Sequence, residues 1–462
     1  MIKAEIERCA GIDVGKKFLS VTIMVGPLEG EPRVEKLTFG TIRAELVKLR
    51  EWLQKEKITH AVMESTGSYW KPIFNELEGS VKVYIANPTE VKIRKGHKTD
   101  DKDGWWLAHL LRHAMIQPSF IPPRAQRELR DLTRYRKKLL GNGTAEKNRV
   151  QKVLEDANVK LGDVLGDIFG EGGQLMLDAL LKGEETPQQI AQHAQRRAKS
   201  KIPEIIASLE GHQMSDHHRR MIHHHLDHMK MLEEKIGILD GEIEEQIKKA
   251  GMEEQWELMR SVPGVEQTSA ATILAEIGPD MTVFTNQRHI SSWAGVCPGN
   301  NRTAGKSKGS KTTRGNKFVK SALTECAWGA ARKNGCFLKE KFWRIKTKSK
   351  GQDAPAIVAV GHTLLILIYH VLTTGEPYQE RGVTELDERQ KDRAIRHHIR
   401  RLGKLGVAVS SPRVAKGASG STRPCRVLSG EKKAKPSSRR PRPVSPGEET
   451  PRRKTRSRSK SS

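Results

Sequence analysis

Signals for several protein classes are scarce in this sequence. Its five cysteines are scattered through 462 residues without a C-x-x-C pair, so neither a disulfide framework nor a cysteine zinc site is indicated. The first residues, MIKAEIERCAGIDVG, lack the apolar segment of a signal peptide. The longest apolar run, Ala356 to Leu372, contains two histidines and is short for a bilayer span. We therefore expect this run to be a buried helix and the protein to be cytoplasmic, without a membrane partner.

Acidic residues are in short supply relative to basic ones. The chain has 82 Lys and Arg against 55 Asp and Glu, which gives a formal net charge of +27. About +18 of this surplus lies after residue 390, as in a basic interaction tail. The rest of the chain is still basic. This surplus predicts a polyanionic partner, because each cation set against a phosphate releases a condensed counterion.

A nucleotide-binding loop is also absent, although one segment has its composition. Residues 299–310 read GNNRTAGKSKGS, whereas a phosphate-binding loop follows the pattern G-x-x-x-x-G-K-[ST]. The pair Gly305 and Lys306 would need a glycine five positions before Gly305, and that position is Asn300. The pattern argues against an ATP site of this type and leaves another kind of phosphate contact open.

Composition and periodicity divide the chain into four parts. Residues 1–123 alternate strand-like and helix-like runs, which is typical of an α/β layer fold. Residues 124–255 are strongly charged and helical. Residues 256–382 are mainly helical and begin with a helix, a Pro-Gly turn and a second helix, which could offer turn amides to a phosphate or be a plain α-hairpin. Residues 383–462 are expected to be disordered, because their composition cannot form a core.

Apolar residues form two rows in the second part, and those of the first row recur every seven positions. The rows are Ile222, Met229, Ile236 and Ile243, and Leu226, Leu232 and Leu239. This period predicts a coiled coil or a long helical hairpin. Pairing between chains and packing of two helices within one chain are both open. The same segment carries six histidines between residues 217 and 228, for which a metal site and a helix interface are alternative interpretations.

Four carboxylates stand where predicted elements end or begin. Asp13 and Glu64 lie near the ends of predicted strands, and Asp100 and Asp103 lie where a helix should start. Asp100 and Asp103 are three residues apart, so they share one helix face. Four ionised carboxylates facing one point would repel one another, and two Mg²⁺ ions about 4 Å apart would balance them and clamp a phosphodiester. The alternative is structural, because the helix dipole favours acids in a first turn without any metal.

Longer motifs carry a resemblance that spacing alone does not provide. The chain resembles the insertion sequence 110 family of transposases over roughly residues 8–380. The N-terminal motifs are GIDVGKKFLSVTI, MESTGSYWKPIF, KTDDKDGWWLAHLLRHAMIQPSFIPP and RELRDLTRYRKKL. The C-terminal motifs are SVPGVEQTSAATILAEIG and WAGVCPGNNRTAGKSKGSKTTRGNKFVKSALTECAWGAA.

The resemblance implies a fold, a metal and partners. The fold is a multidomain one, with a ribonuclease-H-like, Holliday-junction-resolvase-like N-terminal domain, a helical coiled coil for assembly as a dimer or tetramer, and a mainly helical C-terminal domain. The implied cofactor is Mg²⁺, as two ions held by the family's acidic tetrad, which falls on the four carboxylates named above. The implied partners are donor and target DNA and an element-encoded guide RNA, in the nucleoid of a bacterial cytoplasm.

The family's second catalytic element is a serine that forms a covalent link to DNA, and it falls on Thr303. A threonine hydroxyl can act as a nucleophile, but its β-methyl group restricts χ1. Three interpretations are open: Thr303 attacks DNA, Ser307 or Ser310 substitutes for it, or the chain binds nucleic acid without recombining it. A nuclease that cuts branched DNA with the tetrad alone is a further alternative. Basic residues near Thr303 are expected to contact DNA phosphates; they are Lys306, Lys308, Lys311, Arg314 and Lys317.

Overall fold

The computed structural model of the chain describes ten segments. They are residues 3–65, 67–87, 91, 100–116, 119–299, 302–303, 306–307, 312–380, 395–396 and 399–402, with the backbone alone described at 100–102, 302–303 and 306–307. Most of the predicted tail, residues 383–462, lies outside the described residues.

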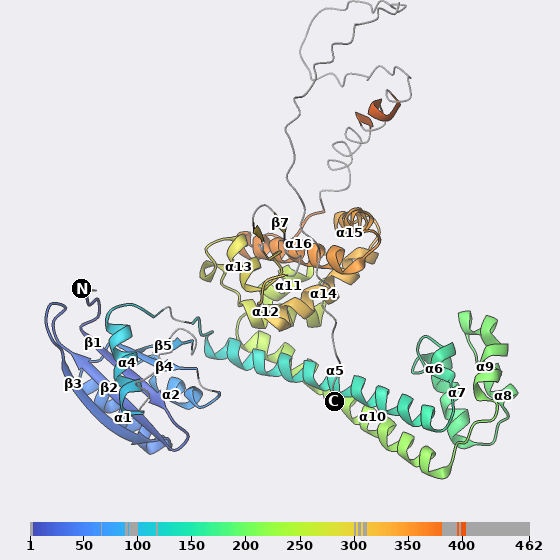
Figure 1. Cartoon of the computed structure of the whole chain (residues 1–462), viewed down its shortest axis with the longest axis horizontal. Coiled ribbons are helices and arrows are strands. Elements are labelled where there is room, and N and C mark those ends of the chain that lie inside the picture. Colours follow the sequence, from blue (N-terminus) through green and yellow to red (C-terminus); the bar gives the residue numbers. More distant parts are fainter. Residues whose placement is uncertain are drawn as a thin grey trace, which may run out of the picture. The chain divides into compact units, whose positions relative to one another are not determined.

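A five-stranded mixed sheet forms the core of the N-terminal domain (Figure 1). The strands are β1 (Arg8–Val14), β2 (Phe18–Val25), β3 (Arg33–Gly40), β4 (His60–Glu64) and β5 (Lys82–Ala86). Their order is β3-β2-β1-β4-β5. The first three strands pair antiparallel, while β4 pairs parallel with β1 and β5. The sequence-based prediction of an α/β domain is confirmed.

Helices cover both faces of this sheet. One face packs against α1 (Arg43–Lys55) and α2 (Trp70–Leu77) through side chains that alternate along the strands, and the other packs against α4 (Asp100–Arg112). Ile42 precedes α1 and is 67 % exposed, and the buried stripe of the helix begins with Leu46.

A missing side chain lets α4 lie directly on β1. A Cβ atom at Gly11 would stand 2.1 Å from the carbonyl oxygen of Gly104 and 2.4 Å from the backbone nitrogen of Ala108. Only glycine permits this approach. Across the same face, Cys9 Sγ lies 3.5 Å from the carbonyl oxygen of Ala108, and burial raises the pKa of this thiol to about 12.

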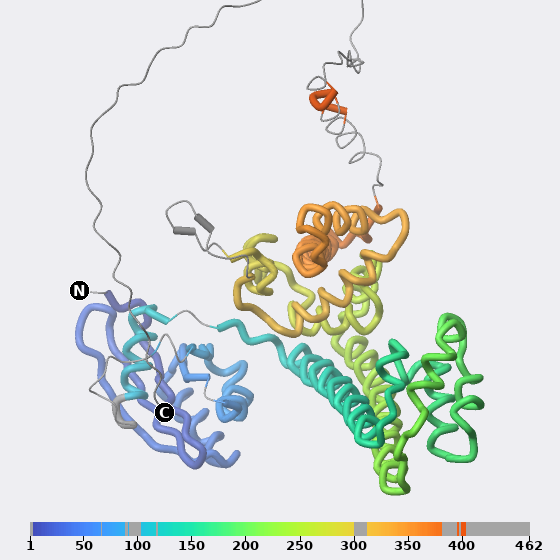
Figure 2. Tube along the Cα trace, turned by 45° about the vertical axis from the view of Figure 1, so that its right-hand side comes forward, coloured from blue at the N-terminus to red at the C-terminus, as the bar shows by residue number. Residues whose placement is uncertain are grey.

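Two long helices lie side by side in both views of the chain (Figures 1 and 2). They are α5 (Arg124–Asp156) and α10 (Asp216–Lys249). The contacts of Asp156 with His218 and of Arg136 with Asp240 show that they run antiparallel. Five of the seven heptad residues are buried in α10: Ile222, Met229, Leu232, Leu239 and Ile243. The heptad pattern therefore serves a hairpin within one chain, and pairing between chains stays a prediction.

The histidine run belongs to this hairpin. Glu146 of α5 is buried, and its carboxylate accepts hydrogen bonds from Nδ1 of His225 (2.8 Å) and Nδ1 of His228 (3.0 Å) and pairs with Arg149. Burial acts to raise the pKa of Glu146, but the bond from His225 and the charge of Arg149 hold it below its usual value. Within the described residues, no group of three His, Cys, Asp or Glu is placed to hold a metal.

Short helices close one end of the hairpin around a core of their own. They are α6 (Leu161–Val164), α7 (Glu171–Lys182), α8 (Pro187–Gln192), η1 (Arg196–Lys201) and α9 (Ile202–Leu209).

The C-terminal domain is helical apart from one small hairpin. Its helices are α11 (Glu253–Arg260), α12 (Gln267–Ile277), η2 (Met281–Val283), α13 (Gln287–Trp293), α14 (Lys317–Arg332), α15 (Phe337–Lys348) and α16 (Asp353–Thr374). By length and composition, α16 could cross a membrane, and it is the one such helix in the described part of the chain. It instead packs on α11, α13, α14 and α15, as predicted for a buried helix.

The Pro-Gly turn between α11 and α12 is packed against α14. Gly264 has a φ of +81°, and a Cβ there would stand 2.4 Å from the carbonyl oxygen of Cys326. Val262 and Val265 on either side are buried. This packing supports the plain α-hairpin and gives no support to the alternative in which the turn binds a phosphate.

The contact between β1 and α4 predicts the effect of a single methyl group. Gly11→Ala would drive a Cβ into the backbone of Gly104, so we expect the free energy of unfolding to fall by about 1–3 kcal/mol or more. Thermal unfolding of the full chain measures it. Gly141→Ala is the control, because nothing lies within 4 Å of the new methyl group on α5; it should raise stability by about 0.5–1 kcal/mol. Equal midpoints for the two variants would contradict the close approach.

Candidate active site

The register of the sheet brings Asp13 and Glu64 to neighbouring positions. Ile12 pairs with Met63 across the parallel strands β1 and β4, so the next residue on each strand stands at the same level. Side chains alternate along a strand, and Gly11 contacts α4, so Asp13 is on the α4 face. Its neighbour Glu64 shares that face. Both side chains are partly exposed.

The first turn of α4 lies over the same end of the sheet. The half-buried Asp103 precedes Gly104, whose Cβ position would be 3.2 Å from both the carbonyl oxygen of Ser20 and Oγ1 of Thr22 on β2. Ser20 is the cross-strand partner of Asp13. The backbone positions of three of the four predicted carboxylates therefore lie toward one end of one face, although no three described acidic side chains stand close enough together to hold a metal. Asp100 begins α4, one turn before Asp103, but its side chain lies outside the described residues.

Two buried hydroxyl groups on β2 lie close to Asp13, on the face that packs against α4. Oγ of Ser20 and Oγ1 of Thr22 have no hydrogen-bond partner among the described residues, although both side chains are buried. A buried hydroxyl without a partner costs free energy unless water or a ligand satisfies it. Sequence reasoning missed both residues. Their signal is a polar Ser-x-Thr pair inside the otherwise apolar strand FLSVTIMV.

Trp105 and Trp106, which follow the acidic cluster, differ in their surroundings. Trp106 packs into the α4 face and its Nε1 donates to the carbonyl oxygen of Val91 at 3.3 Å. Trp105 is exposed and stacks on the ring of His109 at 5.0 Å. Trp106 therefore helps to pack α4 on the sheet.

Thr303 lies in a short hairpin of the C-terminal domain. Strands β6 (Arg302–Thr303) and β7 (Lys306–Ser307) pair antiparallel, with Thr303 opposite Lys306. Their side chains, and all of Lys308, Ser310 and Lys311, lie outside the described residues. Lys306 stands in a strand and not at a helix start, which agrees with the absence of a nucleotide-binding loop.

The base of this hairpin is closed by backbone contacts. Pro298 bridges Thr312, and a Cβ at Gly315 would stand 2.3 Å from the backbone nitrogen of Gly295. Immediately after this crossing, the side chain of Asn316 caps α14 and accepts from the backbone N–H groups of residues 318 (2.9 Å) and 319 (3.2 Å). Two of the predicted phosphate contacts, Arg314 and Lys317, are exposed at this junction.

One buried carboxylate ties the junction to α5. The side chain of Glu276, at the end of α12, is fully buried. Its Oε1 accepts from Nε of Arg134 (2.7 Å), and its Oε2 accepts from Nη2 of Arg134 (2.9 Å) and Nδ2 of Asn316 (2.7 Å). Nε of Arg130 lies 3.6 Å from Oε2 and donates to the carbonyl oxygen of Ala275 at 2.8 Å. The residue that caps α14 is thereby fixed to two arginines of α5.

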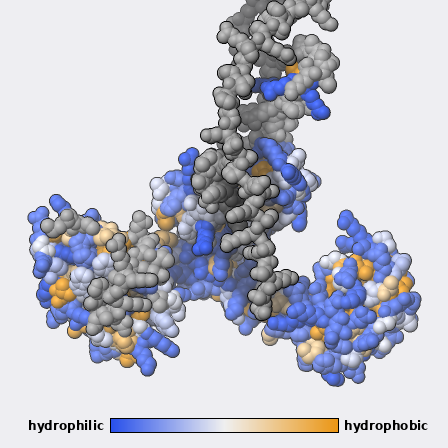
Figure 3. Space-filling view, viewed as in Figure 1, coloured by the Kyte–Doolittle hydropathy of each residue, from blue (hydrophilic) through white to orange (hydrophobic). Residues whose placement is uncertain are grey.

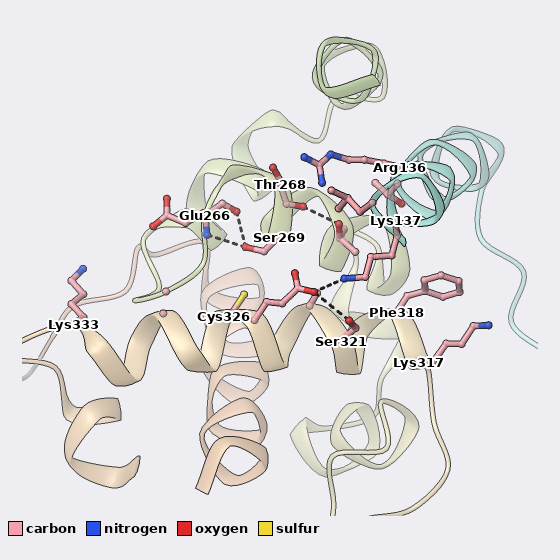
Figure 4. A pocket seen from close by; sticks show the side chains of 17 residues that line it. Arg136, Lys137, Glu266, Thr268, Ser269, Lys317, Phe318, Ser321, Cys326 and Lys333 are labelled. Carbon is pink, nitrogen blue, oxygen red and sulfur yellow. Dashed lines mark hydrogen bonds and ion pairs between the residues drawn. The ribbon is translucent and has the colours of Figure 1, made fainter. Parts of the chain in front are cut away.

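A groove of about 750 Å³ runs between α5, α12 and α14 (Figure 4). Its charged lining residues are Arg136, Lys137, Lys317, Lys333, Glu266 and Glu325. Lys137 and Glu325 pair across it, as the dashed line in Figure 4 marks. Burial raises the pKa of the Cys326 thiol in its wall to about 11.

Hydrophilic residues dominate the visible described surface of the protein (Figure 3), as the composition requires.

The two domains that carry these features match family models. Residues 10–159 match the DEDD IS110 model, described as "Transposase", and residues 256–341 match the model described as "Transposase IS116/IS110/IS902 family". A putative transposase, y4pF/y4sB of Sinorhizobium fredii, is 22 % identical over 347 residues, covering 73 % of this chain and 78 % of its own length. A solved structure of Thermus thermophilus RuvC matches with 15 % identity and a TM-score of 0.20, over 24 % of this chain and 99 % of its own.

A mixed-sheet domain is joined by a helical hairpin to a mainly helical domain, and the match of both regions to transposase models defines a protein of the DEDD transposase class. The chain belongs to the IS116/IS110/IS902 family of transposases.

The Glu276 cluster predicts a large effect from a small change. Glu276→Ala would leave Arg134 and Arg130 without their buried anion, so we expect the free energy of unfolding to fall by about 3 kcal/mol. Glu325→Ala removes the exposed partner of Lys137 and should cost less than about 1 kcal/mol. The midpoints of thermal unfolding of the two variants measure this difference. A Glu276→Ala midpoint equal to that of Glu325→Ala would show that the cluster does not hold the domain together.

Proposed function

We propose that this transposase exchanges DNA strands through a covalent link between Thr303 and DNA, with Asp13, Glu64, Asp100 and Asp103 as its metal-binding tetrad. The observation that carries the proposal is the register of β1 and β4, which makes Asp13 and Glu64 neighbours under the first turn of α4. Within this proposal, the N-terminal domain is ribonuclease-H-like.

The residues at this end of the sheet fit Mg²⁺. Carboxylate oxygens are hard ligands, which Mg²⁺ prefers, and the ion keeps several waters when it binds to protein. The hydroxyls of Ser20 and Thr22, which lack partners among the described residues, would meet those waters. A pair of bound Mg²⁺ ions would supply positive charge to the attacked phosphate.

The chemical step proposed for Thr303 is a transesterification. Its hydroxyl oxygen forms a bond to a DNA phosphorus, one phosphorus–oxygen bond of the backbone breaks, and the freed deoxyribose oxygen takes up a proton. The hydroxyl proton of Thr303 passes to solvent or to a tetrad carboxylate. Attack by a deoxyribose hydroxyl of another strand reverses the link and completes an exchange.

The proposed partners are donor DNA, target DNA and an element-encoded guide RNA, with assembly of the chain as a dimer or tetramer. Basic residues at the hairpin junction support contact with phosphates; those described are Arg314 and Lys317, both exposed. The same role is proposed for Lys306, Lys308 and Lys311. Each phosphate contact releases counterions, so binding should weaken steeply with salt.

Thr303 provides the sharpest test of the covalent step. Wild-type protein is incubated with element-end DNA, the RNA transcribed from the element and Mg²⁺, then run on denaturing gels. We expect a protein–DNA adduct, which Thr303→Ala abolishes and Thr303→Ser preserves or increases, because serine lacks the methyl group that restricts χ1. An adduct that survives in Thr303→Ala would assign the attack to another hydroxyl, and Ser307→Ala and Ser310→Ala would identify it.

The same gels separate the alternative functions. Free cleaved DNA without an adduct, lost in Asp13→Ala, would identify a nuclease that uses the tetrad and water. Binding of DNA and RNA with neither product would identify a chain that binds without recombining.

Metal binding has a readout that does not depend on activity. Millimolar Mg²⁺ should raise the thermal midpoint of the wild-type chain, because a ligand that binds only the folded state stabilises it. Asp13→Asn should reduce this shift severalfold, while Asp178→Asn, on α7, should leave it unchanged. An equal shift in both variants would show that Mg²⁺ binds elsewhere.

A further inference from the structure

Two indole side chains are exposed on the outer face of the C-terminal domain. Trp328 on α14 is 37 % exposed and Trp343 on α15 is 51 % exposed. The buried ring of Phe342 supports both, with its centroid 5.9 Å from that of Trp328 and 5.5 Å from that of Trp343. Each indole thus rests on the core, which limits its motion while leaving it open to solvent.

Positive charge surrounds these rings. Residues 332–350 contain eight Lys and Arg and one Glu. Nζ of Lys346 lies 5.0 Å from the ring centroid of Trp343 and 5.6 Å from that of Phe342. Arg332 stands one turn beyond Trp328 on α14, and Lys339 one turn before Trp343 on α15, so each shares a helix face with an indole.

Most of this charge is not neutralised within the domain. Lys346 pairs with Asp353 at 2.6 Å. The other seven cations make no ion pair with any described residue: Arg332, Lys333, Lys339, Lys341, Arg344, Lys348 and Lys350. We call the face formed by Trp328, Trp343, Arg332, Lys339 and residues 344–350 the α14–α15 surface.

We propose that the α14–α15 surface binds unpaired nucleotides, with bases stacked on Trp328 and Trp343 and phosphates held by the surrounding cations. Aromatic faces and cations are the two components of single-strand binding, since each base offers a π face and each nucleotide a charge. A duplex keeps its bases stacked inside and would use only the cations. An apolar protein partner would gain nothing from the unpaired positive charge.

This inference rests on the proposed function, which needs unpaired strands. They could come from a loop of the guide RNA or from DNA displaced during exchange, and both present the same chemistry. The surface lies on α14 and α15, away from the tetrad and from the Thr303 hairpin in the chain, so holding a strand here is separate from cutting one.

The test measures binding of labelled twelve-nucleotide single strands, oligo(U) RNA and oligo(dT) DNA, and of a twelve-base-pair duplex, in buffer without Mg²⁺. Trp343→Leu keeps apolar bulk but removes the π face, and we expect it to weaken single-strand binding about tenfold. The duplex should bind with the same affinity to the wild-type protein and to Trp343→Leu. Trp343→Tyr should restore most of the affinity, and Trp105→Leu, which removes an exposed indole from α4, is the control.

The outcomes are distinct. Stronger binding of RNA or of DNA would identify the source of the strand, and either supports the inference. Unchanged binding in Trp343→Leu, or an equal loss for duplex and single strand, would overturn it. Loss of self-association without loss of nucleotide binding would also overturn it and identify a protein interface. Because Mg²⁺ is absent and no cleavage is scored, failure here and absence of the Thr303 adduct are separate results.

Discussion

The C-terminal domain depends on the buried carboxylate of Glu276. A fully buried charge is tolerated only when it is paired and hydrogen-bonded, and here Arg134 and Asn316 meet both of its oxygens. These partners come from α5 and from the first residue before α14. The cluster therefore fixes where α14 starts relative to the long hairpin. Because the backbone contacts that close the base of the Thr303 hairpin reach Gly315, immediately before Asn316, the same cluster determines where that base stands.

The N-terminal domain positions its predicted carboxylates by backbone geometry. Glycine at 11 lets α4 touch β1, and parallel pairing aligns the ends of β1 and β4. Small residues at 11 and 104 are thus requirements of this close packing. Glycine at 104, which lowers helix propensity, stands within 3.2 Å of two β2 oxygens where a methyl group would be tight.

The sequence predicted what depends on local pattern. Alternating strand-like and helix-like runs predicted the α/β domain, and seven-residue spacing located the buried side of α10. The spacing could not tell whether α10 pairs with α5 or with another chain, because the same apolar row satisfies both. Glu276 carried no local signal, since its partners are 40 to 146 residues away in sequence. That the hydroxyls of Ser20 and Thr22 lack hydrogen-bond partners among the described residues became visible only once α4 was placed on their face.

The threonine at position 303, where the resemblance implies a serine, can be weighed against the conformation of its backbone. Thr303 lies in a strand, the backbone conformation that β-branched residues favour. The stiffness at χ1 that hinders adjustment during attack also lowers the entropy lost in holding a hydroxyl at one orientation. If that orientation matches the line of the proposed attack, threonine slows the reaction little. If it does not, the methyl group blocks the rotation that serine would make. The base of the hairpin is closed by the contact of Gly295 with Gly315. Under the proposal that Thr303 attacks DNA, its χ1 torsion angle sets the direction of the hydroxyl, which is why threonine and serine should differ in the rate of adduct formation.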